Sequence, residues 1–205
     1  MVSLLLASLA WAHRPHAVVS ALVVAPGFQV NGRAWLVFAP DDATVLLRTD
    51  DFGAHWSVQG GALQADRIVD LAELRGVLYA LGADGTVWVS PDEAATWVPY
   101  EPAGYAGSSL SAGTAGIAIA TDSGVWVGEP TGGMTQALAG VAVTEVAWAA
   151  DAETLLARTA DGGVARSEDG GASFTTLDGL DGTATAIGEV NGAVFVGTTE
   201  SAWRW

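Results

Sequence analysis

The sequence contains no cysteine and no lysine. The absence of cysteine excludes disulfide bonds, but it does not decide the compartment, because many exported bacterial proteins have none. All eight basic residues are arginine, and 23 acidic residues bring the formal net charge to −15. Nucleic-acid binding requires a cationic surface that neutralises phosphates. The charge balance therefore argues against a nucleic-acid partner.

Long hydrophobic runs and long amphipathic helices are also missing. No apolar stretch is long enough to span a bilayer. The apolar runs are short and are bounded by glycine, aspartate and proline, which is typical of β-strands. Half of the residues are hydrophobic and only 15% are charged, so the chain can bury a core, and 26 glycines are available for tight turns. The sequence therefore predicts an all-β protein.

A short motif recurs at nearly constant spacing along the chain. Its pattern is Ser/Thr-x-Asp-x-Gly-x-x-aromatic, and residues 49–56 and 167–174 match it fully. Residues 90–97 differ only by Ala94 in place of glycine, and an eroded fourth copy begins at Gly128. The starting positions are separated by 41, 38 and 39 residues. A period near forty residues is typical of the blade repeats of a β-propeller.

The motif resembles the Asp-box, or bacterial neuraminidase repeat, of a β-propeller family that includes sialidases, sortilin-type receptors and the photosystem II assembly factor. The resemblance covers about residues 17–205 and implies blades of four antiparallel strands, with the motif between the third and fourth strands. It implies a structural role, in which the aspartate accepts hydrogen bonds within the turn, the glycine supplies a positive φ, and the aromatic ring packs beside the next blade. The residues with this implied role are Thr49, Asp51, Gly53, Trp56, Ser90, Asp92, Trp97, Ser167, Asp169, Gly171 and Phe174.

The repeat predicts about five blades, at approximately residues 17–61, 62–103, 104–140, 141–180 and 181–205. The expected third strands carry equivalent residues at Leu47, Trp88, Trp126, Ala165 and Trp203. Since most tryptophans occur in repeat register, Trp88 and Trp126 are expected to be buried between blades. The fifth blade stops where the motif begins in the others. We therefore predict an incomplete last blade whose edge strand is open to pairing with a partner strand.

Residues 1–12 resemble a secretory signal peptide. A leucine-rich run is followed by Ala10-Trp11-Ala12, a typical cleavage site, although no lysine or arginine precedes the run. We therefore expect residues 13–205 to be the mature domain, exported to the periplasm or the exterior of a bacterium. If the segment is retained instead, residues 3–9 are apolar and long enough to pair in the fifth blade and close the ring.

No catalytic set emerges from the sequence. The sialidase resemblance implies three arginines that clamp a carboxylate, a Tyr–Glu pair and an aspartic acid, with an Arg-Ile-Pro motif near the first blade. Here the nearest segment is residues 13–16, His-Arg-Pro-His, which does not match. Arg48, Arg166 and Arg204 occupy one repeat position, which blade architecture explains better than a single active centre.

A metal site and a cofactor are not expected either. His13 and His16 are weak candidates for binding a transition metal, because Pro15 favours an extended backbone that need not bring the two imidazoles together. The favoured interpretation is a non-catalytic binding or assembly scaffold for an unidentified protein or carbohydrate. A glycan-directed hydrolase of the sialidase or glycosidase type and a truncated remnant of a longer propeller protein are the alternatives.

Overall fold

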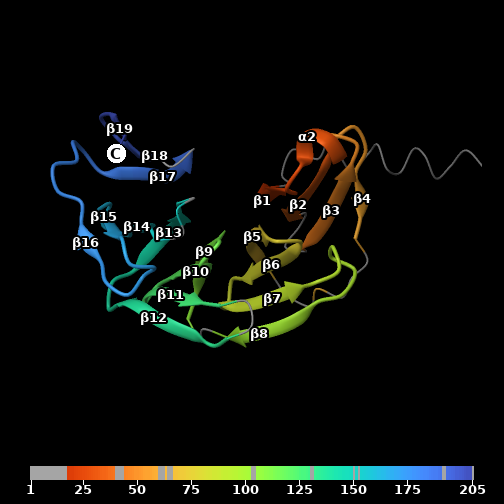
Figure 1. Cartoon of the computed structure of the whole chain (residues 1–205), viewed down its shortest axis with the longest axis horizontal. Helices are drawn as coiled ribbons and strands as arrows, with labels where there is room; N and C mark the ends of the chain where they lie inside the picture. The colour runs from red at the N-terminus through yellow and green to blue at the C-terminus, as the bar shows by residue number, and fades with distance from the viewer. Residues whose placement is uncertain are drawn as a thin grey trace, which may run out of the picture.

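The computed structural model describes residues 18–39, 44–59, 63, 67–102, 105–129, 132–149, 151, 153–190 and 193–204. These residues form five antiparallel sheets, four with four strands and the last with three. The sheets are arranged around a common centre as the blades of a β-propeller (Figure 1). The predictions of an all-β propeller of about five blades and of an incomplete last blade are confirmed.

The strands of each blade follow one another in the chain. Blade 1 contains β1 (Val18–Val24), β2 (Arg33–Ala39), β3 (Val45–Asp50) and β4 (Ser57–Val58). Blade 2 contains β5 (Ile68–Leu74), β6 (Val77–Gly82), β7 (Thr86–Ser90) and β8 (Val98–Pro102). Blade 3 contains β9 (Gly107–Gly113), β10 (Gly116–Thr121), β11 (Gly124–Gly128) and β12 (Met134–Ala139). Blade 4 contains β13 (Val143–Trp148), β14 (Leu155–Thr159), β15 (Val164–Ser167) and β16 (Thr175–Thr176), and blade 5 contains β17 (Ala184–Val190), β18 (Ala193–Thr198) and β19 (Ala202–Arg204).

One short helix, α2 (Phe28–Asn31), interrupts this pattern between β1 and β2. Gly27 and Gly32 flank it with left-handed backbone conformations, which glycine adopts without steric cost. Within the described residues, no helix is long and apolar enough to cross a membrane.

The first strand of each blade lies on the inner side of the arc and the fourth strand on the outer side (Figure 1). Successive first strands are in contact, from β1 to β5, β9, β13 and β17. Among the described residues no comparable contact joins β17 back to β1, so the arc is open between blades 5 and 1 (Figure 1). The predicted signal peptide, the strand that residues 3–9 would offer, and His13 and His16 all lie outside the described residues.

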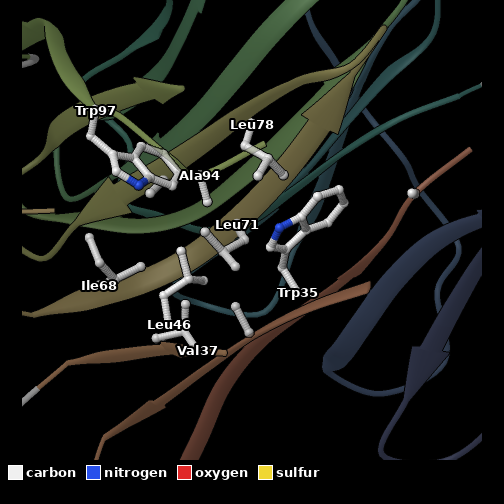
Figure 2. Packing of buried hydrophobic residues seen from close by; sticks show 11 residues of the cluster. Trp35, Val37, Leu46, Ile68, Leu71, Leu78, Ala94 and Trp97 are labelled. Carbon is white, nitrogen blue, oxygen red and sulfur yellow. The ribbon is translucent and has the colours of Figure 1, made fainter. Parts of the chain in front are cut away.

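The hydrophobic core is divided among the four junctions between consecutive blades. At the first junction, Trp35, Val37 and Leu46 of blade 1 pack against residues of blade 2 such as Leu71 and Leu78 (Figure 2). Equivalent clusters join blades 2 and 3, blades 3 and 4, and blades 4 and 5. Because each sheet buries its faces only against its neighbours, the stability of the fold comes from these junctions.

Candidate functional site

The three well-preserved copies of the repeat motif form turns with the same polar contacts. In the last copy, the Ser167 hydroxyl donates to Asp169 Oδ1 (2.7 Å) and accepts the Gly171 amide (2.8 Å). Asp169 in turn accepts the amide (2.8 Å) and the hydroxyl (2.6 Å) of Ser173. Each carboxylate oxygen of Asp169 therefore has a donor within the turn.

The other two turns repeat this arrangement. In the turn of blade 2, the Ser90 hydroxyl donates to Asp92 (2.9 Å), which also accepts the amide (2.8 Å) and hydroxyl (2.6 Å) of Thr96. In the turn of blade 1, Thr49 donates to Asp51 (2.8 Å), and His55 supplies both its amide (2.8 Å) and its ring Nδ1 (2.6 Å) to the same carboxylate. Both carboxylate oxygens of each aspartate thus accept hydrogen bonds from donors within the turn. These aspartates are therefore assigned a structural role rather than ligand binding.

Backbone conformation explains the glycine of the motif. Gly53 and Gly171 have φ values of 86° and 92°, in the left-handed region that glycine tolerates. In the turn of blade 2 the non-glycine residue Ala94 has a φ of 75° at the same position, where its methyl group is fully buried.

The aromatic residue of the motif packs beside the preceding blade, whereas the sequence had suggested the next one. Trp97 of blade 2 belongs to the cluster shared with blade 1, and Phe174 of blade 4 packs against the cluster shared with blade 3. Trp56 of blade 1 has no preceding blade among the described residues, and it is 38% exposed.

The turn aspartates make the fold sensitive to acid. Hydrogen bonds, of which the Ser173 hydroxyl gives the largest effect, lower the pKa of Asp169 to about 2. Since the pKa in an unfolded chain is about 3.9, the stabilising contribution of this carboxylate is fully present above about pH 4 and is lost as the pH falls toward 2. We expect Asp169→Asn to lower the melting temperature at neutral pH and to flatten its decline between pH 4 and 2. Melting curves recorded from pH 7 to 2, with the exposed Asp178→Asn as control, test this; an acid limb identical to that of the wild type contradicts it.

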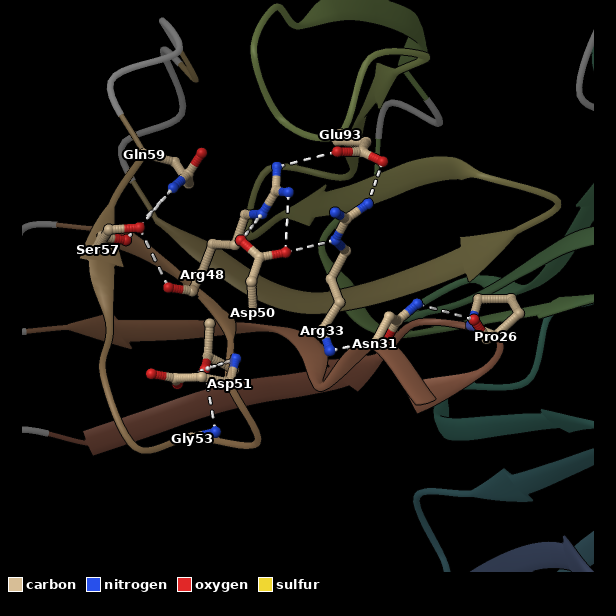
Figure 3. Close-up of polar contacts among 11 residues, drawn as sticks. Pro26, Asn31, Arg33, Arg48, Asp50, Asp51, Gly53, Ser57, Gln59 and Glu93 are labelled. Atoms are coloured by element: carbon tan, nitrogen blue, oxygen red, sulfur yellow. Dashed lines mark hydrogen bonds and ion pairs between the residues drawn. The ribbon is translucent and has the colours of Figure 1, made fainter. Parts of the chain in front are cut away.

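The arginines that share one repeat position do not converge on a single centre, because they lie on blades 1, 4 and 5. Arg48 pairs with Asp50 (2.9 Å) and with Glu93 of blade 2 (3.0 Å). Arg33 pairs with the same two carboxylates, so the four side chains form a neutral ionic cluster across the first blade junction (Figure 3). Arg166 pairs with Glu168 of its own blade (2.8 Å).

A second polar system, which the sequence analysis missed, runs along the inner strands. Asp70 of β5 accepts the amide of Leu110 on β9 (2.8 Å), and burial raises the pKa of the Asp70 carboxyl. Ser109 of β9 accepts the amide of Val146 on β13 (3.4 Å). Glu145 of β13 accepts the amide of Ile187 on β17 (3.3 Å) and the guanidinium Nε of Arg158 (2.9 Å). These side chains join neighbouring blades, and in the described residues no three acidic or histidine side chains are grouped to hold a metal ion.

The strand register places one apolar row across each blade. On blade 1, Leu22, Leu36, Leu47 and Val58 lie directly opposite one another on β1 to β4. Residues directly opposite in antiparallel strands share one face of the sheet. We call the face that carries this row the leading face of a blade, and the other the trailing face.

The equivalent rows of the later blades are all covered. They are Leu71, Ala80 and Trp88 on blade 2, Leu110, Ile119 and Trp126 on blade 3, Val146, Ala157 and Ala165 on blade 4, and Ile187, Val196 and Trp203 on blade 5. Each row packs in the cluster shared with the preceding blade. Trp88 and Trp126 are half-buried there, with their indole nitrogens fully covered. The leading faces of blades 2 to 5 are therefore all packed against the preceding blade.

The leading face of blade 1 is the exception, because no described residues cover it. Leu22 and Val58, at the two ends of its row, are 60% and 69% exposed. Exposed large apolar side chains are concentrated on this blade and its loops, which hold seven of the eleven in the described part of the chain: Val19, Leu22, Val24, Val30, Phe52, Trp56 and Val58. Two of them, Leu22 and Val58, belong to the leading row itself, and a concentration of exposed apolar side chains is typical of interaction sites. The leading face of blade 1 is therefore the candidate functional site.

The sequence matches no protein-family model and no curated protein. Solved structures with the same fold include YCF48 bound to D1 peptide (TM-score 0.64, 16% identity, 88% of this chain and 60% of that chain). They also include the WD40 repeats of RRP9 (TM-score 0.68, 13% identity, 89% and 61%) and PorZ of Porphyromonas gingivalis (TM-score 0.60, 15% identity, 87% and 24%). The chain spans about 60% of the first two structures and about a quarter of PorZ. At these identities the similarity establishes the β-propeller fold alone.

Proposed function

We propose that the chain is a non-catalytic β-propeller scaffold that binds a protein through the leading face of blade 1. One observation carries this proposal: the row of side chains that packs against the preceding blade at all four internal junctions is exposed at both ends on blade 1, at Leu22 and Val58, and half-buried in the middle, at Leu36 and Leu47. Binding energy at protein interfaces comes mainly from apolar side chains that become fully desolvated. The solved propeller YCF48, which has a similar fold, holds a bound peptide and so lends support to a protein ligand.

A matched pair of charge substitutions tests the proposal. Val58→Asp places a carboxylate on the leading face of blade 1, whereas Val98→Asp places one on an equally peripheral strand, β8, at a valine that is 56% exposed. Proteins retained by the tagged variants from the native host are quantified by mass spectrometry. We expect a partner that the wild type and Val98→Asp retain and that Val58→Asp loses at least tenfold, with all three proteins folded. Equal retention by the three contradicts the proposal, and turnover of aryl-glycosides by the pure protein favours the hydrolase alternative.

We further propose that the repeat turns are Asp-boxes and that the protein is exported. The first idea is supported by the motif and by the shared contacts of the three turns. The second is supported by the apolar run and the Ala10-Trp11-Ala12 site. An N-terminus at His13 in protein purified from its host is the expected result, and an N-terminus at Met1 contradicts export.

A further inference from the structure

We infer that the partner covers the leading face of blade 1 with a β-sheet of its own, packed as a preceding blade packs. This inference rests on the function proposed above and adds the kind of partner. Within the chain, four leading faces are covered, and in every case by the trailing face of another antiparallel sheet. The surface on blade 1 continues this series, so the same type of surface fits it.

The first junction shows which kinds of side chain the partner must place against the leading face of blade 1. Blade 1 offers Ala21, Trp35 and Val37 from its trailing face to Leu71 and Ala80 of blade 2 (Figure 2). One large aromatic ring, that of Trp35, together with small and branched apolar side chains thus packs along the row. Because strands lie about 4.8 Å apart, a row across four strands is about 14 Å long. A single added strand covers only part of that width, whereas a sheet covers it all.

The inner edge of the face adds a polar requirement. Leu110, Val146 and Ile187 occupy the same position on β9, β13 and β17, and the amide of each donates a hydrogen bond to a side-chain oxygen of the preceding blade. At the first junction the equivalent amide, that of Leu71 on β5, donates instead to Asp70 of its own strand. Leu22 holds that position on β1, and the described residues place no blade before it. We therefore expect the partner to bring a hydroxyl or carboxylate to the Leu22 amide.

A second copy of this chain fits the face poorly. Each copy carries a net charge of −15, so two copies repel each other. A sheet on a different protein, with basic residues around its apolar face, avoids this repulsion.

Site-specific photo-cross-linking tests the inference. The chain has no cysteine, so Leu22→Cys, Val58→Cys and the control Val98→Cys each give one site for a thiol-reactive benzophenone. The labelled, isotopically heavy protein is added to extract of the host, irradiated, and its cross-linked peptides are sequenced. We expect the labels at positions 22 and 58 to capture one protein at least tenfold more than the label at position 98. We also expect the two labels to cross-link to two different strands of that protein. Within each strand the cross-linked residues should be i and i+2, since alternate residues of a strand share one face.

The possible outcomes separate the inference from the proposed function. If neither leading-face label captures a protein above the control, both ideas are wrong. If a protein is captured through a helix or a single segment at both positions, binding stands and the sheet-type partner is wrong. Cross-links to residues 1–17 of the same chain, or to an unlabelled second copy, also overturn the inference. In the purified complex, hydrogen exchange of the Leu22 amide should slow at least tenfold, and an unchanged rate contradicts the expected acceptor.

Discussion

Truncation of Leu71 to alanine is expected to cost about 2–5 kcal/mol of unfolding free energy, whereas the same truncation of Leu22 should cost about 0.5 kcal/mol or less. The two leucines hold the same position on the first strands of blades 2 and 1, opposite Ala80 and Leu36 respectively. Leu71 is 6% exposed inside the first blade junction, and Leu22 is 60% exposed. Leu71 packs in the cluster shared with blade 1, whereas no described residues lie in front of Leu22. Loss of Leu71 leaves a cavity, while loss of Leu22 removes a side chain that is largely in water.

Urea unfolding of the wild type and of the two variants measures both costs. Equal slopes in the three proteins are required, so that the midpoints report stability alone. A cost for Leu22→Ala as large as that for Leu71→Ala would mean that the leading face of blade 1 is covered in the isolated chain, and the proposed site would be wrong.

Replacement of Trp126 by alanine is expected to cost about 3 kcal/mol, the lower end for a large aromatic residue because the ring is only half-buried. Trp126 packs in the cluster between blades 2 and 3, and its ring lies 5.6 Å from that of Tyr105. The same change at Trp56, on the open face of blade 1, should cost much less. Urea unfolding measures the costs, and the difference in acrylamide quenching between the wild type and each variant shows how exposed the removed indole is among the nine tryptophans. A cost below about 1 kcal/mol for Trp126→Ala, with free quenching of the Trp126 fluorescence, would make Trp126 a surface residue and contradict its packing between blades 2 and 3.

The sequence predicted the architecture well because the repeat turns depend on local chemistry. A serine or threonine, an aspartate and a glycine within five residues satisfy one another's hydrogen bonds, so their spacing reports the blade period directly. The third-strand positions of Trp88 and Trp203 followed from the same period, and the structure places both opposite the second strand as expected. The lack of a fourth strand beside β19 among the described residues also followed from the repeat.

The contacts between blades could not be predicted from the sequence in the same way. Asp70 and the Leu110 amide are 40 residues apart, and nothing in the local sequence marks an aspartate that caps a neighbouring strand. The direction in which Trp97 packs depends on how successive sheets are stacked. The expectation that it packs beside the next blade was therefore wrong, because it packs beside blade 1. Leu22 and Leu71 also occur in similar local patterns. Leu71 is buried against blade 1 and Leu22 is 60% exposed, and the local sequence does not say which sheet lies in front of each, so the candidate site became visible only in the structure.

The reactivity of introduced thiols tests most directly whether the leading face of blade 1 is open. Leu22→Cys and Leu71→Cys each place one thiol in a chain that otherwise has none, at equivalent positions of β1 and β5. Labelling with a small maleimide under native conditions should be nearly as fast at position 22 as in unfolded protein, and at least about a hundredfold slower at position 71, where reaction requires local opening. Strong protection at position 22 in the isolated chain would contradict the account.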